Sequence, residues 1–391
     1  MKFARLKTMP MANPLSICMV SDDFLPAATG VGTHIKLLAP GLVRLGHRVS
    51  VVTTRRKGEP EVEQWEGLTI YRVFTVPAYG FYQALPSGRT LRRIFEAVKP
   101  DLVHHHYVGY MMMRVCSIAE SLRLPQVSTY HFSSEVLTQP LPMRPFAPLV
   151  RRLLVSYNNR FNLVIAPSQN LALQIASEGV RTPVRFITNP VVFGGSSQVT
   201  PAERTSDFTV LYAGRLGQEK NIGYLLKAFA SLLKRIPKAV LWVAGRGPEG
   251  PALQSLCTQL GISDKVAFLG FLDHPTLATY YAACDVFVLP SLVETQGLVA
   301  MEAMRFSRPV IVTKAIVSAQ ELVEHGVNGY IVDPGSVQDL TDRLVHLAAA
   351  PALCQAMGVA SYARAEAYRP ELVVAATEAA YREVLARVGR G

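Results

Sequence analysis

The sequence lacks the features of a membrane-spanning or secreted protein. No uninterrupted apolar run approaches the roughly 20 residues that a membrane-spanning helix needs, and the methionine run at 111–113 ends at Arg114. The apolar stretch near the N-terminus is short and runs directly into Asp22 and Asp23, which argues against a secretory signal. We therefore expect a cytoplasmic protein that does not cross a membrane.

Cysteine is scarce and follows no pattern. The five cysteines are widely scattered, odd in number and without CxxC spacing, so they predict neither a disulfide framework nor a zinc site. We expect free, buried thiols in a reducing compartment. The residues concerned are Cys18, Cys116, Cys257, Cys284 and Cys354.

Charged residues make up only 18% of the 391 residues, against 49% hydrophobic residues, which predicts two globular domains of about 180 residues each rather than disorder. The net charge of +11 lies entirely in the first half. Residues 1–192 hold 22 Lys and Arg and 11 Asp and Glu, whereas residues 193–391 hold 18 of each kind. A one-sided basic domain favours an anionic partner, such as a membrane surface or a polyanion, with a solvated basic face as the alternative.

Apolar runs and helical patterns alternate along both halves. In the first half, a βαβ unit over residues 16–53 is followed by strand patterns at 69–74, 102–104, 126–129 and 163–166, and their spacing predicts a parallel sheet throughout. In the second half, six strand patterns alternate with helical patterns at 222–235, 251–260, 275–283, 298–305 and 319–324.

The fold predicted from this alternation is α/β, with two doubly wound, Rossmann-like domains. Residues 193–207 are rich in Gly, Ser, Thr and Pro and have no periodicity, so we place the interdomain linker there. The first domain then comprises residues 1–192 and the second residues 193–370. Amphipathic helices are expected at 350–358 and 370–388, and the tail from about 371 is expected to return to the first domain.

Two basic residues follow the first predicted strand of the second domain. In open parallel sheets ligands bind at the carboxyl ends of the strands, where backbone amides and helix dipoles meet anions. Arg215 and Lys220 flank a turn at Gly217, and together they could hold a diphosphate. Taken alone, this segment would more often be an ordinary basic surface loop.

Two acids follow a later strand of the same domain. Glu294 lies in the loop after the apolar run 286–290, and Glu302 lies within the next helix, so the two carboxylates could bind hydroxyl groups of one ligand. Gly297 between them would let backbone amides approach a phosphate. Solvated acids are the alternative, which is weak for Glu294 beside a buried strand.

The first domain offers weaker signals. A loop with Gly30 and Gly32 joins its first strand and helix, but glycines serve many turns. The histidines at 104–106 end one strand and His131 ends another. Consecutive strand residues point to opposite faces, so these three cannot bind one metal, and we expect no metal site. A structural role is the ordinary alternative for His131.

Several segments together resemble the retaining glycosyltransferases of the GT4 group. In the second half these are GRLGQEKNIGYLLKAF, AGRGPEGPALQSL, FLGFLDHPTLATYYAACDVFVLPS and ETQGLVAMEAMRFSRPVIVT; in the first half they are GVGTHIKLLAPGLVRLGHRVSVVT and PDLVHHHYVGY. The resemblance covers nearly the whole chain and is more specific in the second domain. It implies a GT-B fold, in which the two domains face a central cleft, and the transfer of a sugar from a nucleotide diphosphate to an acceptor.

The resemblance also implies a role for each residue. Arg215 and Lys220 would neutralise the donor diphosphate, Glu294 would hold hydroxyls of the transferred sugar, and His131 would contact the sugar near the reacting carbon. Glu302 would bind the ribose. No protein nucleophile, cofactor or essential metal is expected. The residues expected to bind the donor are Gly30, Gly32, Gly245, Gly297, Leu298, Val299 and Glu302.

Two departures from the family pattern bear on specificity. The usual GDGP is Gly245-Arg246-Gly247-Pro248, which leaves the base open, and the usual EGFG is Glu294-Thr295-Gln296-Gly297. The second variant resembles lipid glucosyltransferases that act on diacylglycerol. UDP-glucose is the expected donor, with GDP-mannose as the alternative.

A membrane lipid is the expected acceptor, because the basic first domain would be drawn to an anionic leaflet. Residues 141–154 mix Met, Phe and Leu with arginines, which suits an interfacial segment or equally an ordinary amphipathic core helix. The sequence thus predicts a peripheral enzyme on the inner face of the membrane. The enzyme alternative glycosylates a polysaccharide or a small metabolite. A nucleic-acid-binding protein is disfavoured, because aromatic residues are not interleaved with the basic clusters.

Overall fold

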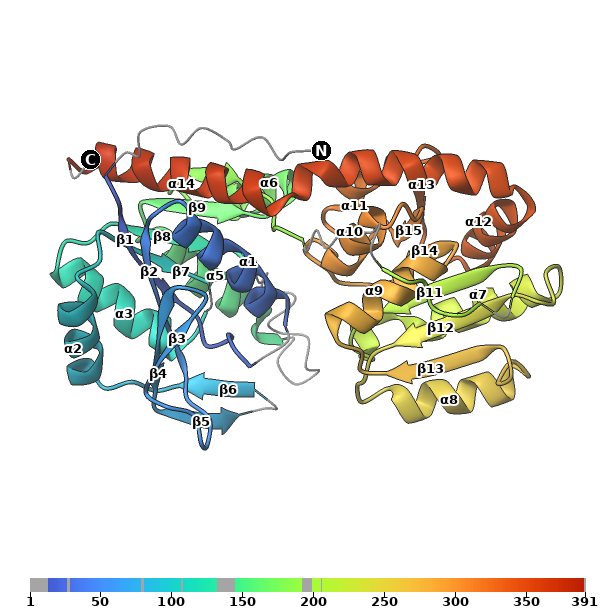
Figure 1. The fold of residues 1–391 in the computed structure, drawn as a ribbon, viewed down its shortest axis with the longest axis horizontal. Coiled ribbons are helices and arrows are strands. Elements are labelled where there is room, and N and C mark those ends of the chain that lie inside the picture. The colour runs from blue at the N-terminus through green and yellow to red at the C-terminus, as the bar shows by residue number, and fades with distance from the viewer. Residues whose placement is uncertain are drawn as a thin grey trace.

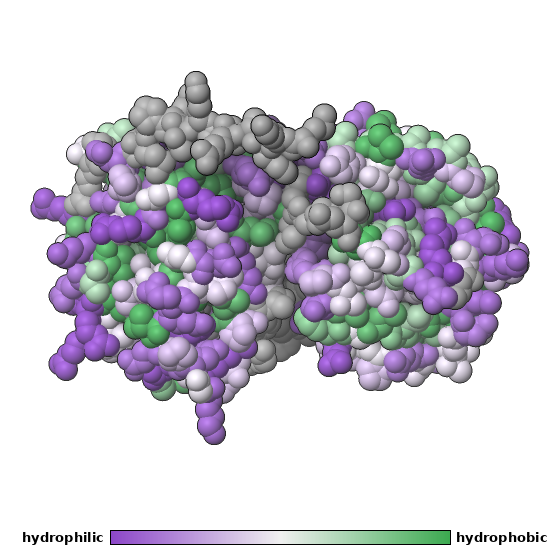
Figure 2. Space-filling model, in the orientation of Figure 1, coloured by the Kyte–Doolittle hydropathy of each residue, from purple (hydrophilic) through white to green (hydrophobic). Residues whose placement is uncertain are grey.

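The computed structural model describes residues 13–26, 29–78, 81–106, 108–131, 145–191, 199–204 and 206–389. It has two α/β domains, each built on its own sheet, with long helices running along one side of both (Figure 1). In the space-filling view the domains form two lobes with polar and apolar side chains interspersed (Figure 2).

The first domain is built on an eight-stranded sheet in the order β10-β9-β8-β7-β1-β2-β4-β3. Helices α1 and α14 cover one face, and α2 and α3 cover the other. Because both faces are covered, β1, β7, β8 and β9 are buried along their whole length rather than at alternate residues. The strands are β1 (Ser16–Val20), β2 (Arg48–Thr54), β3 (Val62–Trp65), β4 (Leu68–Val73), β7 (Leu102–His105), β8 (Gln126–Thr129), β9 (Leu163–Ala166) and β10 (Val184–Phe186); the helices are α1 (Gly30–Arg44), α2 (Gly88–Val98), α3 (Tyr110–Ser121), α5 (Ala147–Asn158) and α6 (Gln169–Ser177).

The expectation of a parallel sheet throughout this domain is wrong at one edge. Strand β3 pairs antiparallel with β4, because only Glu66 and Gly67 connect them and a parallel crossover needs a dozen or more residues. A separate antiparallel pair is formed by β5 (Thr75–Ala78) and β6 (Phe81–Ala84). All other pairs in the eight-stranded sheet are parallel, and the six strands predicted for this domain are confirmed.

The second domain has a six-stranded parallel sheet in the order β13-β12-β11-β14-β15-β16. Every predicted strand and helix of this half is present. Their ends shift by at most two residues, except that α13 continues to Ala365, seven residues beyond the predicted end at 358; helix α12 is additional. The strands are β11 (Thr209–Ala213), β12 (Val240–Ala244), β13 (Val266–Gly270), β14 (Val286–Leu289), β15 (Val310–Thr313) and β16 (Gly329–Val332); the helices are α7 (Ile222–Leu233), α8 (Gly250–Gln259), α9 (His274–Ala283), α10 (Leu298–Arg305), α11 (Ala319–Leu322), α12 (Val337–Ala349), α13 (Pro351–Ala365) and α14 (Pro370–Arg387), with short 3₁₀ turns at Gln218–Lys220 and Glu366–Tyr368.

Helix α14 returns to the first domain, as the sequence predicted. Its side chains Val374, Tyr381 and Leu385 are buried in the same core cluster as Ile35 and Leu42 of α1. The hydroxyl of Tyr381 also lies 2.6 Å from Nδ1 of His104 on β7. The C-terminal helix therefore completes the core of the first domain after the chain has built the second.

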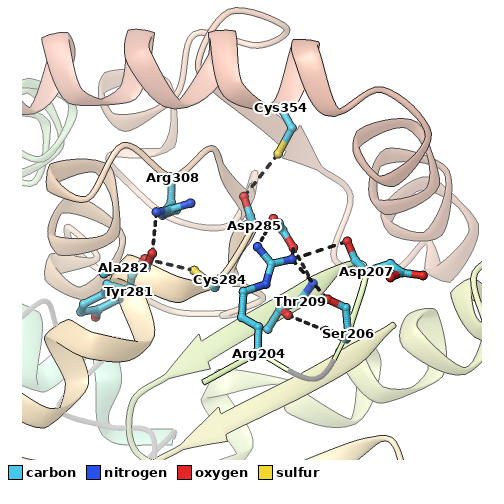
Figure 3. A network of polar contacts seen from close by, with 10 residues as sticks. All are labelled: Arg204, Ser206, Asp207, Thr209, Tyr281, Ala282, Cys284, Asp285, Arg308 and Cys354. Carbon is cyan, nitrogen blue, oxygen red and sulfur yellow. Dashed lines mark hydrogen bonds and ion pairs between the residues drawn. The ribbon is translucent and has the colours of Figure 1, made fainter. Parts of the chain in front are cut away.

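A polar network fixes the start of the second domain at the amino edge of its sheet (Figure 3). The guanidinium of Arg204 donates two hydrogen bonds, of 3.0 and 2.7 Å, to the carboxylate of Asp285, which also accepts the amide of Thr209 at 2.7 Å. The thiol of Cys354 on α13 donates to the backbone carbonyl of Asp285. This network therefore lies at the amino edge of the second sheet. The linker predicted at 193–207 lies partly outside the described residues, which do not include 192–198 and 205.

No single described helix combines the length and apolar composition needed to cross a membrane; α12 taken together with α13 and α14 passes that test only as a pair bent by 105°. All five cysteines are free, four of them buried and Cys354 half-buried.

Candidate active site

The carboxyl edges of the two sheets face one another and are in contact. Gly30 begins α1 after β1, and a Cβ atom there would lie 3.3 Å from Cδ1 of Leu298, which begins α10 after β14. The side-chain amide of Gln296 donates to the carbonyl of Pro167 at 2.8 Å and to the hydroxyl of Thr188 at 2.6 Å. Residues that follow strands of both sheets therefore meet at one interface.

A cluster of cations and acids lies at the carboxyl edge of the second sheet. Because β11 and β14 are neighbours, the turn after β11 carries Lys220 to the loop after β14, where its ammonium forms an ion pair with Glu294. These side chains are 17% and 22% exposed. Arg215 pairs with Glu219 at 2.7 Å, and its own side chain is 58% exposed. The cluster thus holds one exposed guanidinium and one mostly buried ammonium.

The loops around this cluster are held by buried groups. The hydroxyl of Tyr212, on β11, donates to the backbone carbonyl of Arg215 at 2.9 Å. Burial raises the pKa of Tyr212, and the nearby acids Glu294 and Glu219 add to this, so the hydroxyl remains a donor. The amide of Leu292 donates to the carbonyl of Glu219 at 2.8 Å, which joins the two loops directly.

Glycine is required at two positions in these loops. Gly245 has a φ of +141°, and a Cβ atom there would lie 1.8 Å from the carbonyl oxygen of Gly214. Gly297 has a φ of +77° at the N-cap of α10, and its Cβ would lie 2.8 Å from Leu289. Any other residue would displace the loops that carry the charged cluster.

Helix α10 begins directly at the interface. Leu298 and Val299 form its first turn and are half-buried, and no described side chain caps this helix at Gly297. The amides of an uncapped first turn and the helix dipole form a favourable site for an anion. The ion pair of Lys220 and Glu294 lies beside it, since the Gly297 Cβ position is 3.9 Å from Cγ of Glu294.

Glu302 lies one turn further along α10, in different surroundings. It is 8% exposed, accepts a hydrogen bond from Tyr281 at 3.0 Å, and its other oxygen lies 3.7 Å from Nε2 of His274. Burial raises the pKa of Glu302, while His274 and the bond from Tyr281 act in the opposite direction. Glu302 therefore extends the site toward α9.

On the first domain, three histidines lie together. His131 follows β8, His106 follows β7, and Nδ1 of His106 is 3.3 Å from Nε2 of His131. The ring of His34, one helical turn after Gly30 in α1, lies 4.9 Å from the ring of His131 between centroids. Burial lowers the pKa of all three side chains, so each is neutral at pH 7.

Models of two known protein families match the chain, one over each domain. The model described as Glycosyltransferase Family 4 matches residues 28–192, and the model described as Glycosyl transferases group 1 matches residues 197–364. An uncharacterised glycosyltransferase of Methanocaldococcus jannaschii is 30% identical over 363 residues, which cover 85% of this chain and 89% of that protein. The chain belongs to the GT4 glycosyltransferases.

Two further comparisons agree with this membership. The alpha-monoglucosyldiacylglycerol synthase of Acholeplasma laidlawii is 28% identical over 395 residues, which cover 95% of this chain and 98% of that protein. The structure of Anabaena HepE in complex with UDP-glucose superposes with a TM-score of 0.71 at 20% identity, covering 95% of this chain and 99% of that one. The structural likeness confirms the predicted GT-B fold.

In this GT4 glycosyltransferase the residues singled out from the sequence fall into two groups. Arg215, Lys220 and Glu294 form one cluster, with Gly245 supporting an adjacent loop; Gly297, Leu298, Val299 and Glu302 lie along α10 beside that cluster. Gly30 and His131 belong to the first domain, and the contact between Gly30 and Leu298 joins the two groups.

One expected donor residue has its amide already engaged. Gly32 lies within the first turn of α1, and its amide donates to the hydroxyl of Thr29 at 3.1 Å. That hydroxyl in turn donates to Asp23. The amide of Gly32 is therefore engaged in the N-cap of α1.

Sequence reasoning missed His34, His274 and Tyr281. His274 follows β13 just after Asp273, which caps α9, so its position after a strand was a usable signal. His34 had a weaker signal, its spacing of four residues from Gly30 on one helix face. Tyr281 had none, because it fits the apolar pattern of a core helix.

Proposed function

We propose that this glycosyltransferase transfers glucose from UDP-glucose to a membrane lipid such as diacylglycerol, with retention of the anomeric configuration. The observation that carries the proposal is the position of Arg215 and the ion pair of Lys220 and Glu294 beside the uncapped start of α10. Cations, amides and a carboxylate then lie where a sugar diphosphate presents phosphate oxygens and hydroxyl groups.

The diphosphate would replace protein carboxylates as the partner of the two cations. Arg215 now pairs with Glu219 and Lys220 with Glu294, and both pairs are accessible enough to exchange. Once Lys220 binds phosphate, the carboxylate of Glu294 is free to accept hydrogen bonds from hydroxyls of the sugar. Glu302, with His274 beside it, would accept the ribose hydroxyls.

The reaction itself would depend on charge stabilisation and positioning. The bond between the anomeric carbon and the phosphate oxygen breaks, and negative charge develops on the leaving diphosphate next to Arg215, Lys220 and the start of α10. A new bond forms from the acceptor oxygen to the same face of the sugar, and the acceptor proton moves to the leaving phosphate. His131 would hold the sugar from the first domain, so that the reacting atoms are oriented.

A surface of α5 supports the lipid acceptor. Only Leu154 and Asn158 of this helix are buried, whereas Phe146, Leu149 and Leu153 are 51%, 55% and 51% exposed. Spaced three and four residues apart, these three share one helix face. Of the two readings of residues 141–154, these exposures favour an interfacial helix over a core helix; residues 141–144 lie outside the described part of the chain.

The similarity to the alpha-monoglucosyldiacylglycerol synthase of Acholeplasma laidlawii supports the same acceptor class. The basic excess of residues 1–192 adds charge complementarity with an anionic leaflet. A water-soluble acceptor is the second candidate; it would not need an exposed apolar and cationic helix.

Labelled UDP-glucose and diacylglycerol in anionic vesicles test the proposal, with the product extracted into organic solvent. We expect label in the organic phase, and none with Glu294→Ala. Label that stays in the aqueous phase on an added sugar or metabolite would contradict the lipid acceptor but keep the transferase. Transfer from GDP-mannose and not from UDP-glucose would contradict the donor.

A further inference from the structure

The histidines His34, His106 and His131 converge from three different elements of the first domain. One ring nitrogen of each lies within 4.8 Å of those of the other two, and the group borders the interface through Gly30, one turn before His34. Neighbours on a strand face opposite ways, so His104, His105 and His106 cannot bind one metal. The group His34, His106 and His131 is different, because each histidine comes from a separate element.

Polar atoms in this group lack partners although they are buried. Neither ring nitrogen of His34 nor Nε2 of His106 has a described hydrogen-bond partner of normal geometry, and the two residues are 3% and 0% exposed. Asn189 lies beside His34. Its side chain raises the pKa of His34 and so offsets part of the larger lowering by burial. A buried polar atom without a partner costs about 1–3 kcal/mol, and an ion bound by one ring nitrogen of His34 would remove part of that cost.

The spacing fits a tetrahedral ion. A Zn²⁺–nitrogen bond of about 2.0–2.1 Å places two nitrogen ligands about 3.3 Å apart in a tetrahedron. Nδ1 of His106 and Nε2 of His131 are hydrogen-bonded at 3.3 Å, so an ion between them would replace that bond at nearly the same separation. His34 needs a small ring movement to join them, because the longest separation within the group is up to 4.8 Å. The rings are neutral at pH 7, which is the form that binds metals.

The surroundings provide support and room for a fourth ligand. His104 packs against His106 at 3.8 Å between ring centroids, and is itself fixed by Thr129 at 2.7 Å. A cavity of about 10 Å³ borders His106 and His131 and reaches Asn158, whose side-chain oxygen also lacks a partner. That volume is close to what one water molecule needs.

We propose that His34, His106 and His131 bind a transition-metal ion, Zn²⁺ by their all-nitrogen chemistry, and that the bound ion keeps the donor sugar from His131. The metal site rests on the histidines alone, while its inhibitory effect rests on the proposed function. Because the ion would occupy a ring nitrogen of His131, the ion and the sugar would compete for this side chain, and transfer would not require the ion.

Calorimetric titration of the chelator-treated full chain with Zn²⁺ tests the site. We expect one ion per chain, a rise in melting temperature with Zn²⁺, and a loss of affinity of more than about tenfold in His34→Gln and in His106→Gln. His325→Gln, which removes an exposed histidine of the second domain, should bind as the parent does. Absence of binding to the parent chain, or equal affinity in the His34 variant, would overturn the site even if the His106 variant fails to fold.

A second titration separates the two halves of the proposal. If the ion and the sugar compete, saturating UDP-glucose must weaken Zn²⁺ binding by the factor by which Zn²⁺ weakens UDP-glucose binding. Independent binding would overturn the inhibitory effect and leave the metal site standing. UDP-glucose binding without metal is measured first, so that a failure of the donor assignment is recognised separately.

Discussion

The two domains handle polar chemistry in different ways. The first domain contains six of the nine histidines, five of them buried and His131 half-buried, and keeps them neutral. The second places its three histidines at the surface and gathers ion pairs at the carboxyl edge of its sheet. Under the proposed function, the first domain would position the acceptor and the second would bind the anionic donor, and the difference suits that division.

Removing one charge of the second-domain cluster should have the largest effect. Lys220→Ala is expected to lower kcat/KM for UDP-glucose by about 10²–10³-fold, because a cation that stabilises the leaving diphosphate is lost. The melting temperature should change little, since the pair is partly exposed. Lys314→Ala breaks the exposed pair with Asp333 as a control, and equal activity in both variants would contradict the role of Lys220.

The first domain should respond to pH through Asp22. Burial raises the pKa of this carboxyl to about 7, and the neighbouring Asp23 adds to the effect. Between about pH 4 and 7 the folded state holds a proton that the unfolded chain has lost, so this residue destabilises the fold as pH rises through that window. Asp22→Asn should therefore match the parent at pH 4 and be more stable by on the order of 2–4 kcal/mol at pH 8.

Denaturant unfolding measures this difference within one domain, because each domain contains one tryptophan. Trp65 lies on β3 and Trp242 on β12, so Trp242→Phe and Trp65→Phe leave a single probe in either domain. The stability change caused by Asp22→Asn should appear in the unfolding transition that Trp65 reports. A constant difference at every pH would show that the pKa of Asp22 is the same in the folded and unfolded states, and would contradict the shift.

The link between the domains can be weakened at Gln296. Its two hydrogen bonds to Pro167 and Thr188 are buried, and Gln296→Ala should cost about 1–3 kcal/mol by leaving their oxygen atoms without a donor. The transitions reported by Trp65 and Trp242 should then separate along the denaturant axis. Gln338→Ala, which loses an exposed bond to Asp342, serves as the control and should leave them unchanged.

The smallest effects should come from single charges on α5. Arg151→Gln and Arg152→Gln are each expected to weaken binding to anionic vesicles by about 1 kcal/mol, roughly fivefold, and less at high salt. Flotation with such vesicles measures this. Lys227→Gln and Lys234→Gln change the same charge on the second domain, and an equal loss there would contradict a membrane surface on the first.

Local patterns sufficed for the second domain, since each strand is an apolar run and Arg215, Lys220 and Glu294 lie in loops that follow strands. The range of α10 and the positions of Lys220 and Glu294 came from that regularity. Helix α12 could have been found, because Ser336 caps it and Leu340, Leu344 and Leu347 lie on one face.

Less of the first domain could be predicted from the sequence, because its polar contacts join segments that are far apart in the chain. His104 bonds to Tyr381, and His34 meets His131, without any local spacing that relates them. The hairpin of β3 and β4 was not predicted, although only Glu66 and Gly67 separate the two strands and so short a connection requires antiparallel pairing. The contact between Gly30 and Leu298 depends on how two domains pack, which no local pattern specifies.

A structure of the chain with bound UDP-glucose tests the central claim most directly. The account predicts phosphate oxygens at charge-assisted hydrogen-bond distances of about 2.7–2.9 Å from Arg215 and Lys220, next to the first amides of α10, with Glu294 turned from Lys220 to the sugar. A nucleotide bound elsewhere, with the pair of Lys220 and Glu294 intact, would contradict it.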